Sequence, residues 1–217
     1  MNWEAIISNT LAGLLTPTTI AFALAALGLA MHFGFAGLLN FGIAGYMAIG
    51  AYSYAIGVLT FGLPWWGGML LGLVGSVIFS ILLGIPTLRL RGDYLAIVTI
   101  AAAEILRLLF LTTAFEDITG SADGRFGYNS RPDGSGFANA NPFPRGDYGF
   151  GPWTYNAETL WVLVFGLIVL GVCTFLLWAL MRSPWGRVIK GIREDEDAIR
   201  ALGKNVFNYK MQALVIG

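Results

Sequence analysis

The sequence has few charged residues and few of the residues that bind metals. Only 12% of its 217 residues are Asp, Glu, Lys or Arg, about half of the roughly 25% usual in soluble domains. The chain has one cysteine, Cys173, and one histidine, His32, which are too few for an intramolecular disulfide or a zinc cluster. We therefore predict no metal or cofactor. Thirteen basic and thirteen acidic residues leave no surplus to neutralise phosphates, so a nucleic-acid binder is excluded.

Long apolar runs fill most of the remaining sequence. Hydrophobic residues make up 56% of the chain, and residues 5–88 and 159–181 contain no Asp, Glu, Lys or Arg. About 20 apolar residues in a helix cross a bilayer. We therefore predict an all-α polytopic membrane protein with one transmembrane domain over residues 1–217, ending early within a further apolar stretch. The expected spans are residues 11–31, 43–61, 67–88, 94–113 and 159–181.

The basic residues outside these spans are unevenly distributed. Nine lie at residues 89–91 and 182–210, and three lie in the connection 114–158. The positive-inside rule predicts that the first two segments are cytoplasmic and that the long connection and the N-terminus are outside. The connection is rich in aromatic residues, unlike disordered chains. It predicts a folded outer cap that docks a partner or shields the bundle.

A glycine-rich segment follows the first expected span. Residues 32–42 contain three glycines and read poorly as a helix interior, so we expect a broken helix. Such breaks frequently line substrate sites in transporters, which makes Asn40 and Gly42 candidates for the translocation pathway. The alternative is close glycine packing with Asn40 bonded to a neighbouring helix. We expect His32 to be an interfacial side chain rather than a proton relay.

Two opposite charges lie within the fourth expected span. Glu104 follows Asp93 by eleven residues, or about 16 Å of helical rise, and a charge at such depth costs about 2.5–3.5 kcal/mol on insertion scales. Arg107 follows three residues later, on the same helix face. The two residues form either a structural ion pair or part of a pathway or gate.

The charged segment 182–210 predicts a short cytoplasmic helix. Pro184 ends the fifth span, and the acidic residues 194–197 suit the first turn of a helix, where the helix dipole favours negative charge. Gly203 is a typical helix stop. This helix is too short to cross a membrane, so it lies along the cytoplasmic face or docks into a partner.

Several blocks of sequence resemble a known family. The pattern Asp197-Ala198-Ile199-x-x-x-Gly203 resembles the E-A-A-x-x-x-G loop of ATP-binding cassette (ABC) importer permeases, with Asp and Ile as departures. Residues 37–42, 87–99, 118–121 and 186–194 resemble the permease subunits of branched-chain amino acid importers. The resemblance covers nearly the whole chain in order, and together the blocks are more specific than any one alone.

The resemblance implies an assembly in the bacterial inner membrane. Two similar permeases, expected to be a heterodimer, form the pore, two cytoplasmic ATPase subunits drive it, and an external binding protein delivers substrate. The resemblance assigns a cytoplasmic coupling helix to the ATPase contact. The residues it implicates are Arg193, Glu194, Asp197, Ala198, Ile199 and Gly203.

The resemblance also implies the transported substrates, which are branched-chain or related hydrophobic amino acids. Urea or short amides on the same machinery are the alternative, and an ion-coupled carrier or a channel is less favoured. The chain contains no G-x-x-x-x-G-K-[ST] phosphate loop, so ATP hydrolysis is expected on separate subunits. No cluster of nucleophile, base or metal ligands lies within the spans, which argues against a membrane enzyme.

Overall fold

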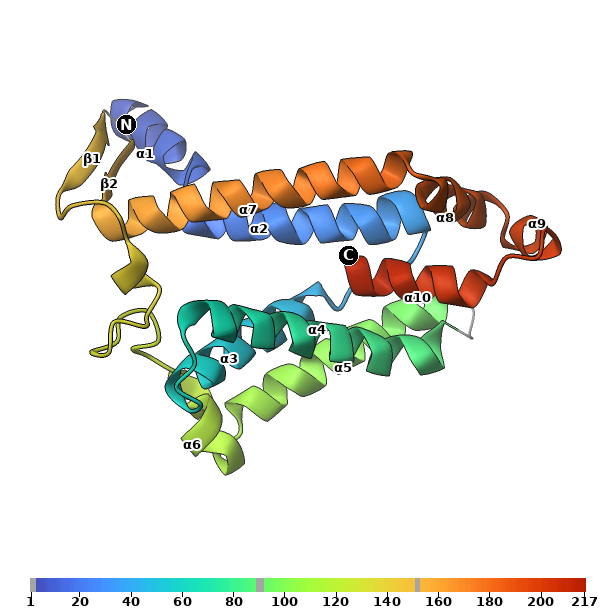
Figure 1. Cartoon of the computed structure of the whole chain (residues 1–217), viewed down its shortest axis with the longest axis horizontal. Coiled ribbons are helices and arrows are strands. Elements are labelled where there is room, and N and C mark those ends of the chain that lie inside the picture. The colour runs from blue at the N-terminus through green and yellow to red at the C-terminus, as the bar shows by residue number, and fades with distance from the viewer. Residues whose placement is uncertain (1–2, 89–91, 151–152) are drawn as a thin grey trace.

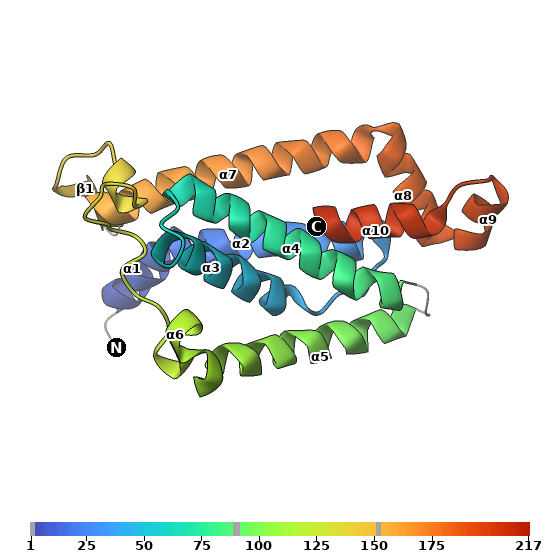
Figure 2. The ribbon, with the colours of Figure 1, turned by 60° about the horizontal axis from the view of Figure 1, so that its bottom comes forward.

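The computed structural model describes residues 3–88, 92–150 and 153–217, and in them the chain is an elongated helical bundle (Figure 1). α2 (Pro17–Leu29) packs along α7 (Ala157–Arg182), while α3 (Ile43–Leu59) packs most extensively on α4 (Trp65–Thr87). α5 (Gly92–Leu111) joins the α3–α4 pair, as Figure 2 shows. The smaller elements are α1 (Trp3–Leu14), η1 (Ala30–Ala36), η2 (Thr113–Phe115), α6 (Glu116–Thr119), η3 (Ser121–Asp123), η4 (Ala138–Ala140), β1 (Asp147–Phe150), β2 (Trp153–Asn156), α8 (Pro184–Glu194), α9 (Glu196–Ala201) and α10 (Val206–Ile216).

Four described helical segments are long and apolar enough to cross a membrane. They are Pro17–Ala36, Trp65–Thr87, Tyr94–Leu111 and Ala157–Arg182, and the apolar helix Ile43–Leu59 is shorter. The all-α polytopic prediction is therefore confirmed, with one short antiparallel hairpin of β1 and β2 added. The third, fourth and fifth expected spans match α4, α5 and α7 to within about two residues at each end.

The prediction that the first span begins at residue 11 is wrong. The chain forms the separate helix α1, and the long helix α2 starts at Pro17. Thr16 caps α2, because its hydroxyl accepts a hydrogen bond from the Thr19 backbone N–H at 3.1 Å. Proline at the first helical position fits this start, where its missing N–H costs nothing.

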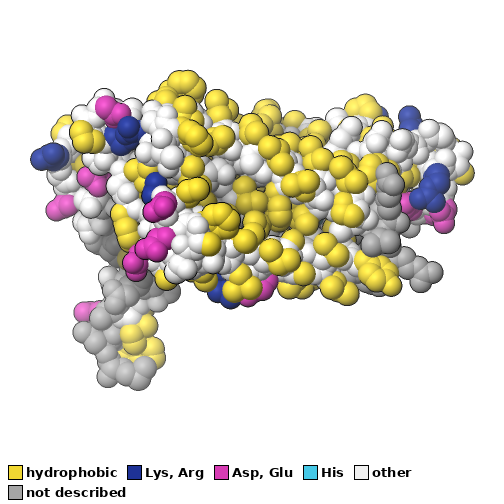
Figure 3. Space-filling view, turned by 90° about the horizontal axis from the view of Figure 1, so that it is seen from below, with side chains coloured by type: hydrophobic (Ala, Val, Ile, Leu, Met, Phe, Trp, Pro, Cys, Tyr) yellow, Lys and Arg dark blue, Asp and Glu magenta, His cyan; other side chains and the backbone are white. Residues whose placement is uncertain are grey.

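The two ends of the bundle differ in character. The end that carries α1, the hairpin and α6 is here called the loop end, and the end that carries α8 and α9 is called the basic end (Figure 1). Hydrophobic side chains cover the middle of the molecule, while most charged side chains gather at the two ends (Figure 3). α1 lies at the same end as the long connection (Figure 1), and the outward orientation of that end stays a prediction. Arg89 and Arg91 lie outside the described residues.

Glycines allow α3 and α4 to approach closely. A Cβ atom at Gly72 would lie 3.0 Å from the backbone oxygen of Gly50, and one at Gly68 would lie 2.8 Å from the Val58 side chain. The Gly68–Gly72 spacing of small residues therefore serves as a helix-packing surface.

The long connection folds into a cap, as its aromatic content predicts. Phe137 stacks on Trp161 with ring centroids 5.4 Å apart, and the Trp161 indole donates to the Phe137 carbonyl at 3.1 Å. Arg131 donates to the carbonyl of Val58, and Arg125 donates to the Thr60 hydroxyl at 3.1 Å. Both arginines thus bind at the C-terminal end of α3, where the helix dipole favours positive charge.

Asp133 supports Arg131 in this cap. Its carboxylate accepts hydrogen bonds from the hydroxyl and amide of Ser135 and lies 2.9 Å from the Arg131 guanidinium. The hydrogen bonds from Ser135, with the nearby Arg131 charge, lower the pKa of Asp133. The carboxylate consequently stays ionised and orients the arginine toward α3.

Replacing Arg131 with glutamine should detach the cap from α3. The Val58 carbonyl is buried and loses a charged donor, so we expect the full-length protein to lose about 1–3 kcal/mol of stability. Thermal unfolding in detergent measures the loss, and Arg145→Gln in the same connection is the control, because Arg145 is exposed. Equal stability of the two variants would contradict the anchoring role.

Candidate coupling and translocation sites

The predicted broken helix lies between α2 and α3. α2 continues into the π-helix η1, which ends where Gly37 adopts a left-handed conformation with φ of +65°. Non-helical chain follows over residues 37–42, and α3 begins part-way along the bundle (Figures 1 and 2). The interruption therefore lies within the length of the bundle, and non-helical backbone at membrane depth is tolerated only against protein or a cavity.

Hydrogen bonds within the protein satisfy the backbone of this break. The fully buried Asn40 accepts from the Gly42 N–H at 2.9 Å, and Thr99 on α5 accepts from the Phe41 N–H at 3.1 Å. A Cβ atom at Gly42 would lie 2.9 Å from the Thr99 carbonyl oxygen, which explains the glycine. Asn40 and Gly42 thus stabilise the break itself, and their part in a pathway stays a prediction.

The expectation that His32 is interfacial is wrong, because its side chain is only 1% exposed. The Asn40 amide nitrogen lies 3.3 Å from Nδ1 of His32 and can only donate, so Nδ1 accepts. The proton therefore sits on Nε2, which lies 3.4 Å from the Leu214 carbonyl on α10. His32 is a buried link between the broken helix and α10.

Glu104 and Arg107 form the predicted pair on α5. The arginine donates through Nε at 2.9 Å and through Nη2 at 2.7 Å to the two carboxylate oxygens. The pair is open to its surroundings in this chain, since the arginine side chain is 58% exposed and the glutamate 53%. It borders a cleft of about 510 Å³ between α3 and α5.

The segment after α7 turns sharply and lies across the basic end. Ser183 caps α8 by accepting from the Gly186 N–H, and Pro184 occupies the first turn. Ile189 and Ile192 are buried against Met31 and Leu38 of the broken-helix region. α8 is therefore an amphipathic helix whose apolar face closes the core at this end.

α9 projects beyond α8 at the tip of the basic end (Figure 1). Asp195 caps it by accepting from the Ala198 N–H at 2.9 Å, and Glu196 and Asp197 make its first turn acidic, whereas Glu194, expected in the same turn, ends α8. A left-handed turn at Gly203, with φ of +76°, follows the helix. Lys210 on α10 pairs with Glu196, which fixes α9 to the bundle.

The six predicted coupling residues divide into two groups. Four are exposed at the tip and available to a partner: Glu194, Asp197, Ala198 and Gly203. The other two contact the chain itself. Ile199 packs so closely on α8 that a Cβ atom at Gly191 would lie 2.8 Å from it, and Arg193 donates to the carbonyl of Gly34 in η1.

Leu202 is a tip residue that the sequence-based list of coupling residues omits. Its side chain is 73% exposed, next to the charged face of α9. A large apolar side chain at the exposed end of a short charged helix is the signal that could have identified it.

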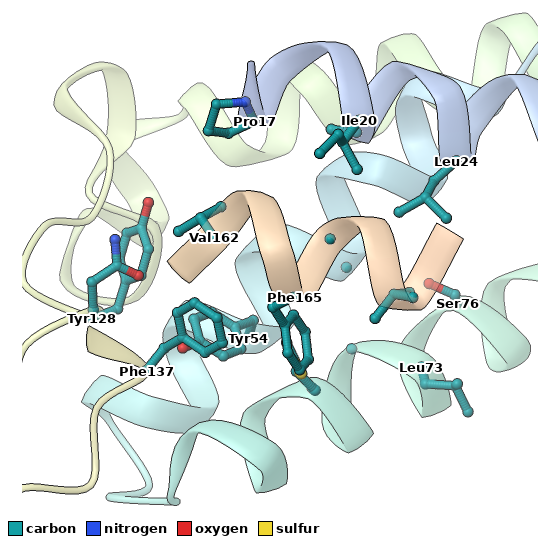
Figure 4. Close-up of a pocket in the computed structure, with 17 residues that line it drawn as sticks. Pro17, Ile20, Leu24, Tyr54, Leu73, Ser76, Tyr128, Phe137, Val162 and Phe165 are labelled. Carbon is teal, nitrogen blue, oxygen red and sulfur yellow. The ribbon is translucent and has the colours of Figure 1, made fainter. Parts of the chain in front are cut away.

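A second cavity, of about 670 Å³, lies toward the loop end between the α2–α7 and α3–α4 pairs (Figure 4). Its walls are mainly apolar, with Ser76 of α4, Tyr54 of α3, and Tyr128 and Asn129 of the cap as polar members. Tyr54 and Tyr128 meet edge to face at 5.9 Å. Only the polar side chains within apolar helices could have suggested this cavity, and nothing in the sequence placed Tyr128 there.

A helical membrane bundle with a broken helix and a projecting helical tip has the architecture of a transport permease. The model of the family described as the branched-chain amino acid transport system permease component matches residues 11–217. The chain belongs to this family.

Named relatives agree with the family match. The chain is 33% identical to the high-affinity branched-chain amino acid transport system permease protein LivM of Salmonella typhimurium and 32% identical to that of Escherichia coli. Each alignment covers 99% of this chain and 51% of the relative. A probable branched-chain amino acid transport permease LivM of Methanocaldococcus jannaschii is 25% identical over 90% of this chain and 60% of its own length. The chain thus spans about half the length of the bacterial relatives, and no solved structure matches it.

Proposed function

We propose that the chain is the membrane-spanning part of a permease subunit in an ATP-driven importer of branched-chain or related hydrophobic amino acids. The basic end faces the cytoplasm of a bacterial inner membrane, and the loop end faces outward. The names of the relatives support the substrate class. The gathering of Arg182, Arg187 and Lys190 at one end supports the orientation.

The contact between Arg193 and Gly34 carries the proposed mechanism of coupling. Arg193 lies one turn before the projecting α9 and donates to the broken helix, 159 residues away in sequence. Its side chain also packs on Gly37, where a Cβ atom would lie 3.0 Å from it. A tilt of the tip therefore moves the broken helix through a direct bond.

The exposed tip is the proposed contact for an ATPase. Asp197, Ala198, Leu202 and Gly203 present a small surface with one apolar anchor, suited to a cleft in a cytoplasmic subunit. ATP hydrolysis takes place on that separate subunit. A second homologous permease completes the pore, and the cap receives an external binding protein.

The test is reconstitution of the full-length protein with candidate ATPase, second permease and binding protein. Leucine should stimulate ATP hydrolysis and be taken up, while urea should do neither. Stimulation by urea alone would transfer the proposal to short amides. No stimulation by either, in an assembled complex, would overturn it.

Crosslinking tests the docking surface independently. Leu202→Cys in a Cys173→Ser background should crosslink to the ATPase subunit, because Leu202 is exposed at the tip. The matched control is Ile168→Cys, an exposed residue in the middle of α7. Equal crosslinking at the two positions, or none at Leu202, would contradict docking at α9.

A further inference from the structure

The cleft between α3 and α5 combines an ion pair with an apolar floor. Tyr52 on α3 and Phe110 on α5 stack with ring centroids 4.1 Å apart. Small side chains of α3 and α5 leave a cleft open beside the two rings. Its volume of about 510 Å³ falls in the range of small-molecule sites. The remaining lining residues are Phe41, Ala44, Ala48, Ile100, Ala103, Glu104, Arg107 and Leu111.

The position of the pair along α5 matters. Glu104 lies seven residues from Leu111, the last residue of α5, or about 10 Å by helical rise, and Arg107 lies about 6 Å from that end. The pair thus occupies the half of the span nearer the loop end. A ligand that enters from that side meets the charges before it reaches the broken helix.

Both charges are bonded to each other yet remain more than half exposed. The carboxylate receives two hydrogen bonds from the guanidinium, so neither charge is left alone at membrane depth. Leaving either one without a partner in a low-dielectric setting is costly. Any ligand that separates them must therefore supply one negative and one positive group.

A zwitterionic amino acid meets this requirement. Its carboxylate can pair with the guanidinium of Arg107 in the bidentate geometry that arginine favours. Its ammonium group can pair with the carboxylate of Glu104, so that every charge stays paired and the net charge of the cleft stays zero. An aliphatic side chain then has the ring and alanine floor to contact.

We propose that this cleft is a binding subsite for the zwitterion of an apolar amino acid, held between Glu104 and Arg107 during transport. The inference rests on the proposed function and adds the chemistry of recognition within the membrane. A neutral ligand such as urea brings no charges to exchange and is rejected here. The permease would then contribute selectivity of its own, beyond that of a binding protein.

Thiol labelling of the full-length transporter without binding protein tests the subsite. In a Cys173→Ser background, Ala48→Cys places a thiol in the cleft, and a cationic methanethiosulfonate should modify it. L-Leucine should slow the modification. Urea, isopentylamine (leucine without its carboxylate) and 4-methylpentanoate (leucine without its ammonium) should not. Ile168→Cys on α7 is the control and should stay unmodified.

Charge variants then test the assigned partners. Arg107→Gln and Glu104→Gln should each raise the leucine concentration for half-protection by roughly 10- to 100-fold, as expected for the loss of one charge-assisted contact. The exchanged pair, Glu104→Arg with Arg107→Glu, retains both charges and should recover part of the protection. A purely structural pair predicts no change in protection for either single variant that still assembles.

The results separate this inference from the proposed function. The same preparation, supplied with ATPase, binding protein and leucine, reports ATP hydrolysis. Normal hydrolysis without leucine protection in the cleft, or protection by isopentylamine equal to that by leucine, overturns the subsite and leaves the proposed function standing. An unmodified Ala48→Cys in an active transporter overturns it as well. Absent hydrolysis with intact protection overturns the proposed function alone.

Discussion

Replacing Gly203 with valine should uncouple ATP hydrolysis from amino acid uptake. Gly203 forms the turn after α9 with φ of +76°, a conformation in which a β-branched residue is strained by about 1–3 kcal/mol. A Cβ atom there meets nothing within 4 Å, so the effect acts through the backbone rather than a clash. The turn relaxes to negative φ and redirects α9 away from its partner.

The measurement compares uptake and ATP hydrolysis in the reconstituted full-length assembly. Valine should lower leucine uptake by at least about tenfold, the equivalent of 1.4 kcal/mol in the docked geometry. Gly203→Asn is the matched control, because asparagine tolerates left-handed conformations far better than valine. Full uptake by the valine variant would refute the role of this turn in coupling.

Local signals made the short helix and its turn at the basic end predictable. Pro184 and Gly203 act on the backbone at their own positions, and the acidic residues act within one helical turn. The Glu104–Arg107 pair is predictable for the same reason, since residues three apart on a helix meet whatever surrounds them. Features fixed over a few residues can be inferred from the sequence alone.

Features that depend on distant segments could not be inferred. The burial of His32 depends on Leu214, which is 182 residues away, and the orientation of Arg193 depends on Gly34. The glycines predict that the helix breaks, but only the packing of α8 and α10 shows that the break faces inward. The cavity at the loop end likewise needs the cap, whose Tyr128 carries no local signal.

These distant contacts give the broken helix two anchors. Arg193 holds η1 from the basic end, and His32 holds it to α10. Both anchors lie within η1, and the non-helical residues 37–42 follow it directly in the chain, so a movement of η1 is passed on to this segment. In the proposed importer, this arrangement lets movement of the tip reach the middle of the bundle.

Replacing Asn40 with leucine should destabilise the full-length protein severely. The side chain is fully buried, accepts from the Gly42 N–H at 2.9 Å and donates to His32 at 3.3 Å. Leucine of similar size leaves both groups without partners, at about 1–3 kcal/mol each. That sum is a large part of the 5–15 kcal/mol typical of folded proteins.

Heating of the detergent-solubilised protein, followed by size-exclusion chromatography, measures this loss. The matched control is Leu39→Met, a volume-conserving change one residue away that should cost less than about 1.5 kcal/mol. The Asn40→Leu variant should leave the folded peak at a clearly lower temperature than the control. If the two variants melt together, Asn40 does not stabilise the break, and its buried amide is free for the alternative role of contacting substrate. Thr99→Val leaves the Phe41 N–H without its acceptor and removes the donor to the Ala96 carbonyl, which keeps its helical position, so this variant should fall between the two.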